Sequence, residues 1–111
     1  MPNDTVQIAC TVANNTITCP ASTSLAGKSR PCTLEFNLSP TNGSYSWLAD
    51  SPYGVVITDG GTEFSSIARA SATKVTVEDA NDDGKTYQYT VTCNGPNGTI
   101  SSDPSIVNRG K

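Results

Sequence analysis

The densest group of potential metal ligands lies in residues 79–84, where acidic and amide side chains alternate. Asp79, Asn81 and Asp83 fit the first half of a calcium loop, in which alternating oxygen ligands precede a glycine that lets the chain wrap around a hard cation. Position twelve of that loop would be Thr90 rather than a bidentate glutamate. The same residue types also favour plain turns, because their side chains bond to nearby backbone groups. The run is therefore either a calcium site or an acidic turn with no cofactor.

Enzyme chemistry has little support in the composition. The chain of 111 residues contains no histidine, so Ser-His and Cys-His mechanisms are not available to it. Ser71 and Lys74 have Ser-x-x-Lys spacing, but that motif needs a helix, and Lys74 begins a predicted strand. A hydrolase with paired carboxylates would need them about 5 to 9 Å apart across a cleft, and Glu35 and Glu63 are candidates. We expect a non-catalytic protein and keep the carboxylate-based hydrolase as an alternative.

The four cysteines are the other chemically distinctive residues. CxxC spacing is absent and so is histidine, which disfavours zinc, copper and haem sites. Disulfides commonly reinforce small domains with thin apolar cores, so the alternation of apolar residues around these cysteines favours two bonds, Cys10 with Cys19 and Cys32 with Cys93. Such bonds imply a secreted, periplasmic, or cell- or virion-surface protein. The alternative is four reduced structural thiols.

The first cysteine pair lies on a predicted N-terminal hairpin, residues 1–20. Apolar and polar residues alternate on both sides of Asn14 and Asn15, which supply the turn. With that turn Cys10 faces Cys19 in a non-hydrogen-bonded pair, where opposed side chains are closest. This geometry suits a cross-strand disulfide.

The remaining chain reads as a loop over 21–31 and a sandwich body over 32–108, all within one domain, 1–111. Two strands of the body, Cys32–Leu38 and Tyr87–Cys93, each carry a cysteine on an apolar face, so they can face each other from opposite sheets. The span 62–72 fits a helical turn and a strand equally well.

Short strands between turns rich in Asn, Asp, Gly and Pro complete the pattern. We therefore predict an all-β fold, an antiparallel two-sheet sandwich of seven to nine strands that carries the N-terminal disulfide hairpin.

The order Cys32, Trp47, Cys93, with an Asp-Gly turn and tyrosines before the last cysteine, resembles the immunoglobulin-like superfamily. These three residues correspond to its strand B cysteine, strand C tryptophan and strand F cysteine. Tyr89 lies four residues before the second cysteine, whereas the corner tyrosine of the family lies two before it. The run 86–92 is also similar to fibronectin type III-like strands. The resemblance implies an immunoglobulin-like architecture for the sandwich body, but no particular function.

Loops at the ends of a rigid sandwich commonly bind partners. The candidate contact residues in the predicted loops are Lys28, Arg30, Tyr53, Asn94 and Asn97. We expect a recognition or adhesion module that binds an extracellular protein or glycan. The alternative is an inhibitor of an extracellular hydrolase, which would insert the loop before Cys32 into the cleft of the enzyme.

Other partner classes are disfavoured. The net charge is −3 and the lysines and arginines are scattered, so no nucleic acid is expected as a partner. No apolar run is long enough for membrane insertion.

Overall fold

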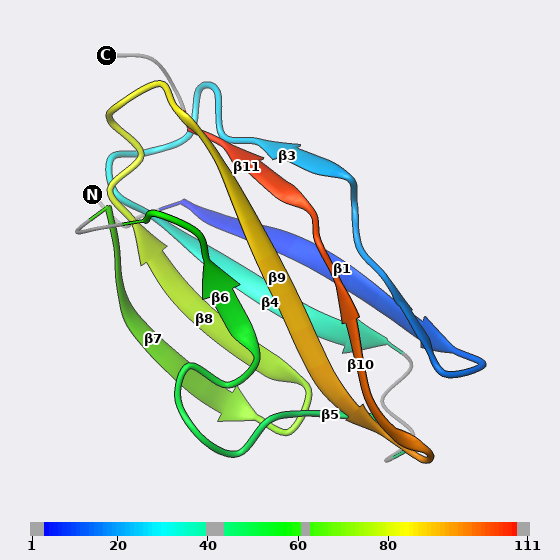
Figure 1. Cartoon of the computed structure of the whole chain (residues 1–111). Coiled ribbons are helices and arrows are strands. Elements are labelled where there is room, and N and C mark those ends of the chain that lie inside the picture. Colours follow the sequence, from blue (N-terminus) through cyan, green and yellow to red (C-terminus); the bar gives the residue numbers. More distant parts are fainter. Residues whose placement is uncertain (1–3, 40–43, 61–62, 109–111) are drawn as a thin grey trace.

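The computed structural model describes residues 4–39, 44–60 and 63–108 as an all-β protein with its strands in two sheets (Figure 1). The described residues form eleven strands and no helix, so none of them belongs to a helix that could cross a membrane. The first sheet has the order β2 (Thr16–Thr18), β1 (Thr5–Ala13), β4 (Cys32–Ser39), β8 (Lys74–Asp79) and β7 (Phe64–Ser71).

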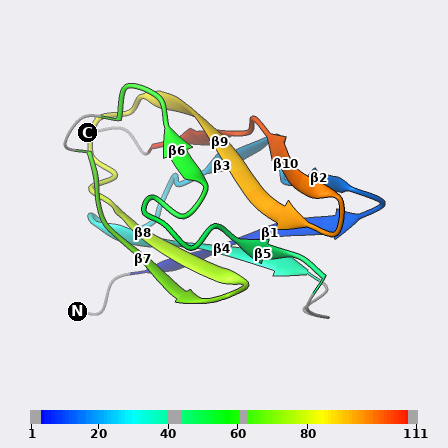
Figure 2. The same cartoon turned by 60° about the horizontal axis from the view of Figure 1, so that its bottom comes forward.

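The second sheet is built around the long strand β9 (Thr86–Gly95). One edge of β9 pairs with β10 (Gly98–Ser102) and β11 (Ser105–Val107), and β11 pairs in turn with β3 (Ser22–Ser24). The other edge pairs with β5 (Ser46–Trp47) and β6 (Val55–Ile57). Figure 2 shows the two sheets as facing layers.

The structure corrects two parts of the predicted architecture. The described residues contain eleven strands rather than seven to nine, partly because the predicted loop over 21–31 contains β3 and the ambiguous span 62–72 contains β7. The sheets are also mixed rather than antiparallel, since β1 pairs in parallel with β4, and β3 with β11. Parallel neighbours need a crossover connection. Residues 14–31 provide one, because they leave the first sheet after β2 and place β3 in the second sheet.

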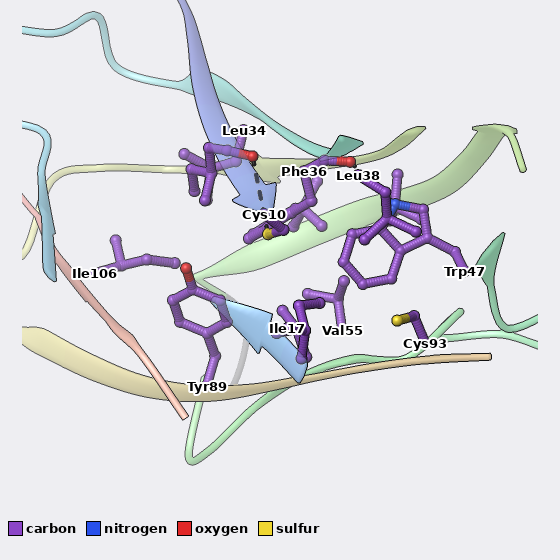
Figure 3. Packing of buried hydrophobic residues seen from close by; sticks show 14 of the residues in the cluster. Cys10, Ile17, Leu34, Phe36, Leu38, Trp47, Val55, Tyr89, Cys93 and Ile106 are labelled. Carbon is purple, nitrogen blue, oxygen red and sulfur yellow. Dashed lines mark hydrogen bonds between the residues drawn. The ribbon is translucent and has the colours of Figure 1, made fainter. Parts of the chain in front are cut away.

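The apolar faces of the two main strands are confirmed. Alternate residues of β4 and β9 are buried, and they are Cys32, Leu34, Phe36 and Leu38 on one strand and Tyr87, Tyr89, Val91 and Cys93 on the other. Phe36 and Tyr89 meet edge to face at the centre of the core, with ring centroids 5.4 Å apart (Figure 3). The indole Nε1 of Trp47 donates a hydrogen bond to the Phe36 carbonyl oxygen at 3.1 Å.

The register of the N-terminal hairpin is also confirmed. Val12 pairs with Ile17 and Thr11 with Thr18, so the next facing residues are Cys10 and Cys19. Their Sγ atoms lie 2.8 Å apart, longer than the ~2.05 Å of a disulfide. All four cysteines are thiols in this structure, so the Cys10–Cys19 disulfide stays a prediction for the oxidised protein.

Cys32 and Cys93, by contrast, lie at opposite ends of the core. Cys32 precedes Phe36 by four residues on β4, and Cys93 follows Tyr89 by four residues on β9, while both strands run in the same direction (Figure 1). Since each strand residue advances the chain by about 3.3 Å, the two thiols are far apart. The predicted Cys32–Cys93 disulfide is therefore wrong for this structure. Side-chain alternation identified the face of each cysteine, but not its height along the strand.

Candidate binding site

The five predicted contact residues do not form one surface. Lys28 and Arg30 are exposed in the loop between β3 and β4, next to the turn over 80–85 that precedes β9. Asn94 lies near the end of β9 and Asn97 in the turn that follows, so most of the length of β9 separates them from the first pair (Figure 1). The molecule measures 43 Å along its long axis.

We call the two ends of the sandwich the acidic end and the hairpin end. The acidic end comprises residues 25–31, Glu63, 78–85 and Asn108. The hairpin end comprises the turns at 14–15 and 95–97, Tyr45, and the thiols of Cys10, Cys19 and Cys93 with Trp47.

Tyr53, the remaining candidate, belongs to neither end. It lies in the turn before β6 with a positive φ of 62°, and its side chain is half-buried against the core. Its backbone N–H donates to the Asp50 carbonyl oxygen at 2.7 Å. Tyr53 therefore contributes to packing more than to an exposed platform.

An open hollow of about 460 Å³ lies at the acidic end. Its charged lining residues are Arg30, Glu63, Glu78 and Asp82, and its neutral ones are Pro31, Ser65, Ser66 and Ala80. Arg30 is the only predicted contact residue among them. The acidic side chains outnumber the basic one, so the walls favour a ligand with positive charge.

Glu63 is held in the wall of this hollow by backbone pairing. Phe64 and Asp79 are register partners at the ends of β7 and β8, which brings Glu63 beside the turn that follows β8. The Ala80 N–H donates to the Glu63 carbonyl oxygen at 2.9 Å, and the Asp82 N–H donates to Oε2 at 3.3 Å. Burial raises the pKa of the Glu63 carboxyl, and nearby Asp83 and Asp82 add to the rise, although the bond from the Asp82 backbone opposes it.

Asn81 fixes the loop that carries Lys28 and Arg30. Its side chain is fully buried, and Nδ2 donates to the carbonyl oxygens of Leu25, Lys28 and Ser29 at 3.3, 3.4 and 3.0 Å. Its own N–H donates to Oδ1 of Asp79 at 2.8 Å, as in an Asx turn. One amide thus clamps the turn after β8 to the loop before β4.

Asp83 is the centre of a second set of bonds. Its Oδ2 accepts a hydrogen bond from the Tyr87 hydroxyl at 2.5 Å, and its Oδ1 accepts one each from the Lys85 N–H and from Asn108 Nδ2 at 3.0 Å. Burial works toward a higher pKa for Asp83, but these bonds outweigh it and lower the pKa. The bond to Asp83 also raises the pKa of Tyr87 to about 12.

The predicted calcium ligands do not converge on a common point. Oδ1 of Asp79 is bonded to a backbone N–H, the Asn81 amide points at carbonyl oxygens, and Asp83 is bonded to Tyr87, Lys85 and Asn108. Within residues 4–39, 44–60 and 63–108, no group of three or more cysteine, aspartate or glutamate side chains is arranged to hold a metal ion. The geometry favours the acidic turn over the calcium loop.

The structure also separates the two candidate catalytic carboxylates. Glu35 lies in the middle of β4, where it accepts a hydrogen bond from Gln7 Nε2 at 2.6 Å and lies 3.7 Å from Lys74 Nζ. Glu63 is at the acidic end, bonded to Asp82 and Asn108. Glu63 lines the hollow at the acidic end, and Glu35 does not.

No protein-family model matches the sequence, and no curated protein sequence is significantly similar to it. The assignment of the site therefore rests on its geometry alone.

The loop proposed for the inhibitor alternative is anchored at its beginning. Leu25 is fully buried, its N–H donates to the Val107 carbonyl oxygen at 2.8 Å, and β3 is part of a sheet. Only residues 26–30 remain to be presented to an enzyme cleft, with Ser29 bonded to Asp4.

Sequence reasoning did not predict Glu78, Asp82 or Asn108 as residues of this site, and it considered Glu63 only as a catalytic carboxylate. Asn108 is only 4% exposed, and its Nδ2 donates to Glu63 Oε2 and to Asp83 Oδ1, both at 3.0 Å. Forty-five positions separate Asn108 from Glu63, so no local pattern could have linked them. The only signal was a polar residue, Asn108, next to the alternating residues that form β11.

Proposed function

We propose that this protein is a secreted or surface-displayed, non-catalytic recognition module that binds an extracellular partner through the hollow at the acidic end. The observation that carries the proposal is the hollow itself, about 460 Å³, with three acidic side chains and one arginine in its walls. Concave sites on loops held by a rigid scaffold are where such domains bind partners.

The charge balance favours a protein partner with exposed lysine or arginine over a neutral glycan. Glu63, Glu78 and Asp82 come from three segments and surround the same space. Complementary charge speeds association and selects among partners, and its contribution falls as salt rises. Binding should therefore weaken with ionic strength.

The experiment compares immobilised peptides of equal length, either lysine- and arginine-rich or neutral, together with a glycan array. The test variant combines Glu78→Gln with Asp82→Asn, which removes two charges from the hollow. The control variant combines Asn94→Ala with Asn97→Ala at the hairpin end. We expect the basic peptides to bind and the test variant to lose about tenfold in affinity, while the control binds like the wild type.

Equal losses in both variants, or binding to neutral glycans alone, would rule out the acidic hollow as the contact surface. Absence of binding to every probe at low salt would count against the recognition function itself.

Export to an oxidising compartment is part of the proposal. It is supported by the facing thiols of Cys10 and Cys19, which are placed for a cross-strand disulfide. The second candidate bond, between Cys32 and Cys93, lends it no support.

We also propose that the sandwich is immunoglobulin-like. The order β1, β4, β8, β7 matches the A-B-E-D sheet of that superfamily, and β9 lies between β5 or β6 and β10 as strand F lies between C and G. Trp47 on β5 occupies the strand C position. The parallel pairing of β1 with β4 and the extra strands β2 and β3 depart from the pattern. An experimental structure with β1 or β7 in the other sheet would contradict the proposal.

A further inference from the structure

A second hollow, of about 210 Å³, lies at the open side of the sandwich, between the edge strands β6 and β7. Among the described strands β7 pairs only with β8, and β6 only with β9, so each presents a free edge here. Figure 2 shows β6 in one layer and β7 in the other. We call this the apolar hollow, because five apolar side chains line it, namely Val55, Ile57, Phe64, Ile67 and Val77.

The core does not enclose all of these side chains. Val55 and Val77 are buried, whereas Ile57, Phe64 and Ile67 pack against the core and stay half-buried. Water therefore reaches apolar surface between the two edges. Covering that surface with an apolar group of a ligand is favourable.

The apolar hollow and the hollow at the acidic end have two lining residues in common. These are Ser65 and Ser66, which lie next to each other on the edge strand β7. One short stretch of free strand edge thus borders both hollows. A ligand seated on this stretch contacts both.

Strand alternation places the two hollows on opposite faces of the first sheet. On β8, Val77 and Asp79 are buried, and Glu78 between them is partly exposed on the outer face. Ser65 is the register partner of Glu78, so it lies on the outer face too. Phe64 is the partner of Asp79 and lies on the inner face. β7 therefore separates an acidic depression on the outer face from an apolar one on the inner face.

A bulge lies at the point where the two hollows meet. Between Ser65 and Ala68 the register with β8 shifts by one residue, and Ser66 within this bulge has a φ of 53°. Such a backbone is strained for a residue other than glycine. Bulges and strained residues recur next to ligand sites. The bulge also limits the regular edge of β7, so only a short strand can pair with it.

We propose that the partner segment bound at the acidic end is a short extended strand that pairs with the free edge of β7, and that its side chains alternate between apolar and basic. A strand added to an edge places successive side chains on opposite faces of the sheet. Its apolar side chains enter the apolar hollow, and its lysines or arginines face the hollow at the acidic end. This inference rests on the proposed function and adds the conformation and the sequence pattern of the partner.

The charges of the two hollows determine which row of the added strand is basic. The outer hollow has Glu63, Glu78 and Asp82 in its walls against the single cation of Arg30. None of the described residues that line the apolar hollow is charged. A lysine placed there would lose water without gaining a counter-charge. The two rows are therefore not interchangeable.

The test compares the binding of two capped octapeptides to the full chain at low salt, measured by fluorescence anisotropy. One peptide alternates valine and lysine, and the other has the same residues in two blocks, so their composition and charge are equal. We expect the alternating peptide to bind about tenfold more tightly.

Pairing with the strand edge is tested on the peptide, with no change to the protein. One alternating peptide carries N-methyl groups on its valines and a second carries them on its lysines. An added strand turns alternate N–H groups toward its neighbour. One of these two peptides should therefore lose its binding, and the other should keep it.

The variant Ile67→Ser tests the apolar hollow. It shortens a half-buried side chain at the mouth, so the alternating peptide should bind about tenfold more weakly and the block peptide as before. Val56→Ser is the matched control. Val56 is 52% exposed and lies between two lining residues of β6 without lining the hollow itself, so this variant should bind both peptides like the wild type.

Equal binding of the alternating and block peptides would overturn this inference and leave the proposed function intact. The same conclusion follows if both N-methylated peptides bind, or if neither does. A dimer in sedimentation equilibrium that Ile67→Ser dissociates would assign the edge to a second copy of this chain and also overturn the inference. If neither peptide binds at low salt, the proposed function fails together with it.

Discussion

The two ends of the sandwich are stabilised by different kinds of interaction. At the acidic end, the buried polar side chains of Asp79, Asn81 and Asn108 hold the loops together through hydrogen bonds. At the hairpin end the buried groups are sulfur and aromatic rings, chiefly Cys10, Cys93 and Trp47. The same long strands, β4 and β9, run through both ends.

Because of this difference, we expect the two ends of one core to respond to different conditions, pH at one end and oxidation at the other. At the acidic end burial raises the pKa of Asp79 to about 6, and Oδ2 of this carboxyl has no hydrogen-bond partner among the described residues. At the hairpin end the Cys10 and Cys19 thiols face each other, so we expect that end to be the one that responds to oxidation. Burial raises the pKa of Cys93 to about 11, and nearby Cys19 adds to the rise, while the hydrogen bond between the two thiols lowers the pKa of Cys19. Substitutions at one end should leave the sensitivity of the other end unchanged.

The largest effect is expected from Trp47→Ala at the hairpin end. Trp47 is fully buried, and its Nε1 donates to the Phe36 carbonyl oxygen at 3.1 Å, so the change leaves a cavity and removes this hydrogen bond. We expect a loss of about 3–5 kcal/mol in the free energy of unfolding. Urea denaturation measures it, and the loss should be equal at pH 5 and pH 7.5.

Val56→Ala is the control for this change, because Val56 is 52% exposed and should cost less than about 0.5 kcal/mol. A loss for Trp47→Ala that differs between the two pH values would show that the ends are coupled.

Oxidation should have the next largest effect. A Cys10–Cys19 disulfide would close a short loop around the turn at Asn14 and Asn15, and the chain-entropy estimate gives about 3 kcal/mol. The oxidised protein should therefore melt at a higher temperature than the reduced one, and mass spectrometry after alkylation should find Cys32 and Cys93 alkylated. Cys32→Ala is the control and should keep the redox difference. A Cys32–Cys93 bond in the mapped protein would refute the strand geometry described above.

At the acidic end the most informative change is Asn81→Ala. It deletes the Nδ2 group that donates to the carbonyl oxygens of Leu25, Lys28 and Ser29, and it places alanine at a φ of 56°. We expect a loss of about 2–3 kcal/mol in urea denaturation, because buried acceptors lose their donor.

Asn15→Ala provides the matched control, since Asn15 has a similar φ of 59° but an exposed side chain. It isolates the backbone cost of a positive φ, about 1 kcal/mol. Equal losses for the two variants would mean that the hydrogen bonds of the Asn81 side chain add nothing to the free energy of unfolding.

The sequence predicted the hairpin end better than the acidic end, for a physical reason. Period-two alternation is local, so it identified the buried rows of β4 and β9 and the register that opposes Cys10 to Cys19. The heights of Cys32 and Cys93 depend on how two sheets are stacked, which alternation does not encode.

Polar networks are harder still to predict. Asn81 was predicted to be a calcium ligand through its side-chain oxygen. In the structure its side-chain N–H groups instead donate hydrogen bonds to a loop that is distant in sequence. Asn108, Glu63 and Asp83 meet only because the ends of β7, β9 and β11 coincide in space. Such contacts have no signature in spacing or composition.

The smallest effect is expected between the two ends, at Glu35. This carboxylate accepts a hydrogen bond from Gln7 and lies 3.7 Å from Lys74 on the outer face of the first sheet, where water and salt screen the charge. Glu35→Gln should change the free energy of unfolding by less than about 1 kcal/mol and leave its pH dependence as in the wild type. The urea series at pH 5 and 7.5 measures both. Because Glu35→Gln and Asp79→Asn each remove one negative charge, equal changes in the pH dependence of the two variants would attribute that dependence to net charge. Different changes would attribute it to the buried carboxyl of Asp79, whose Oδ2 has no hydrogen-bond partner among the described residues.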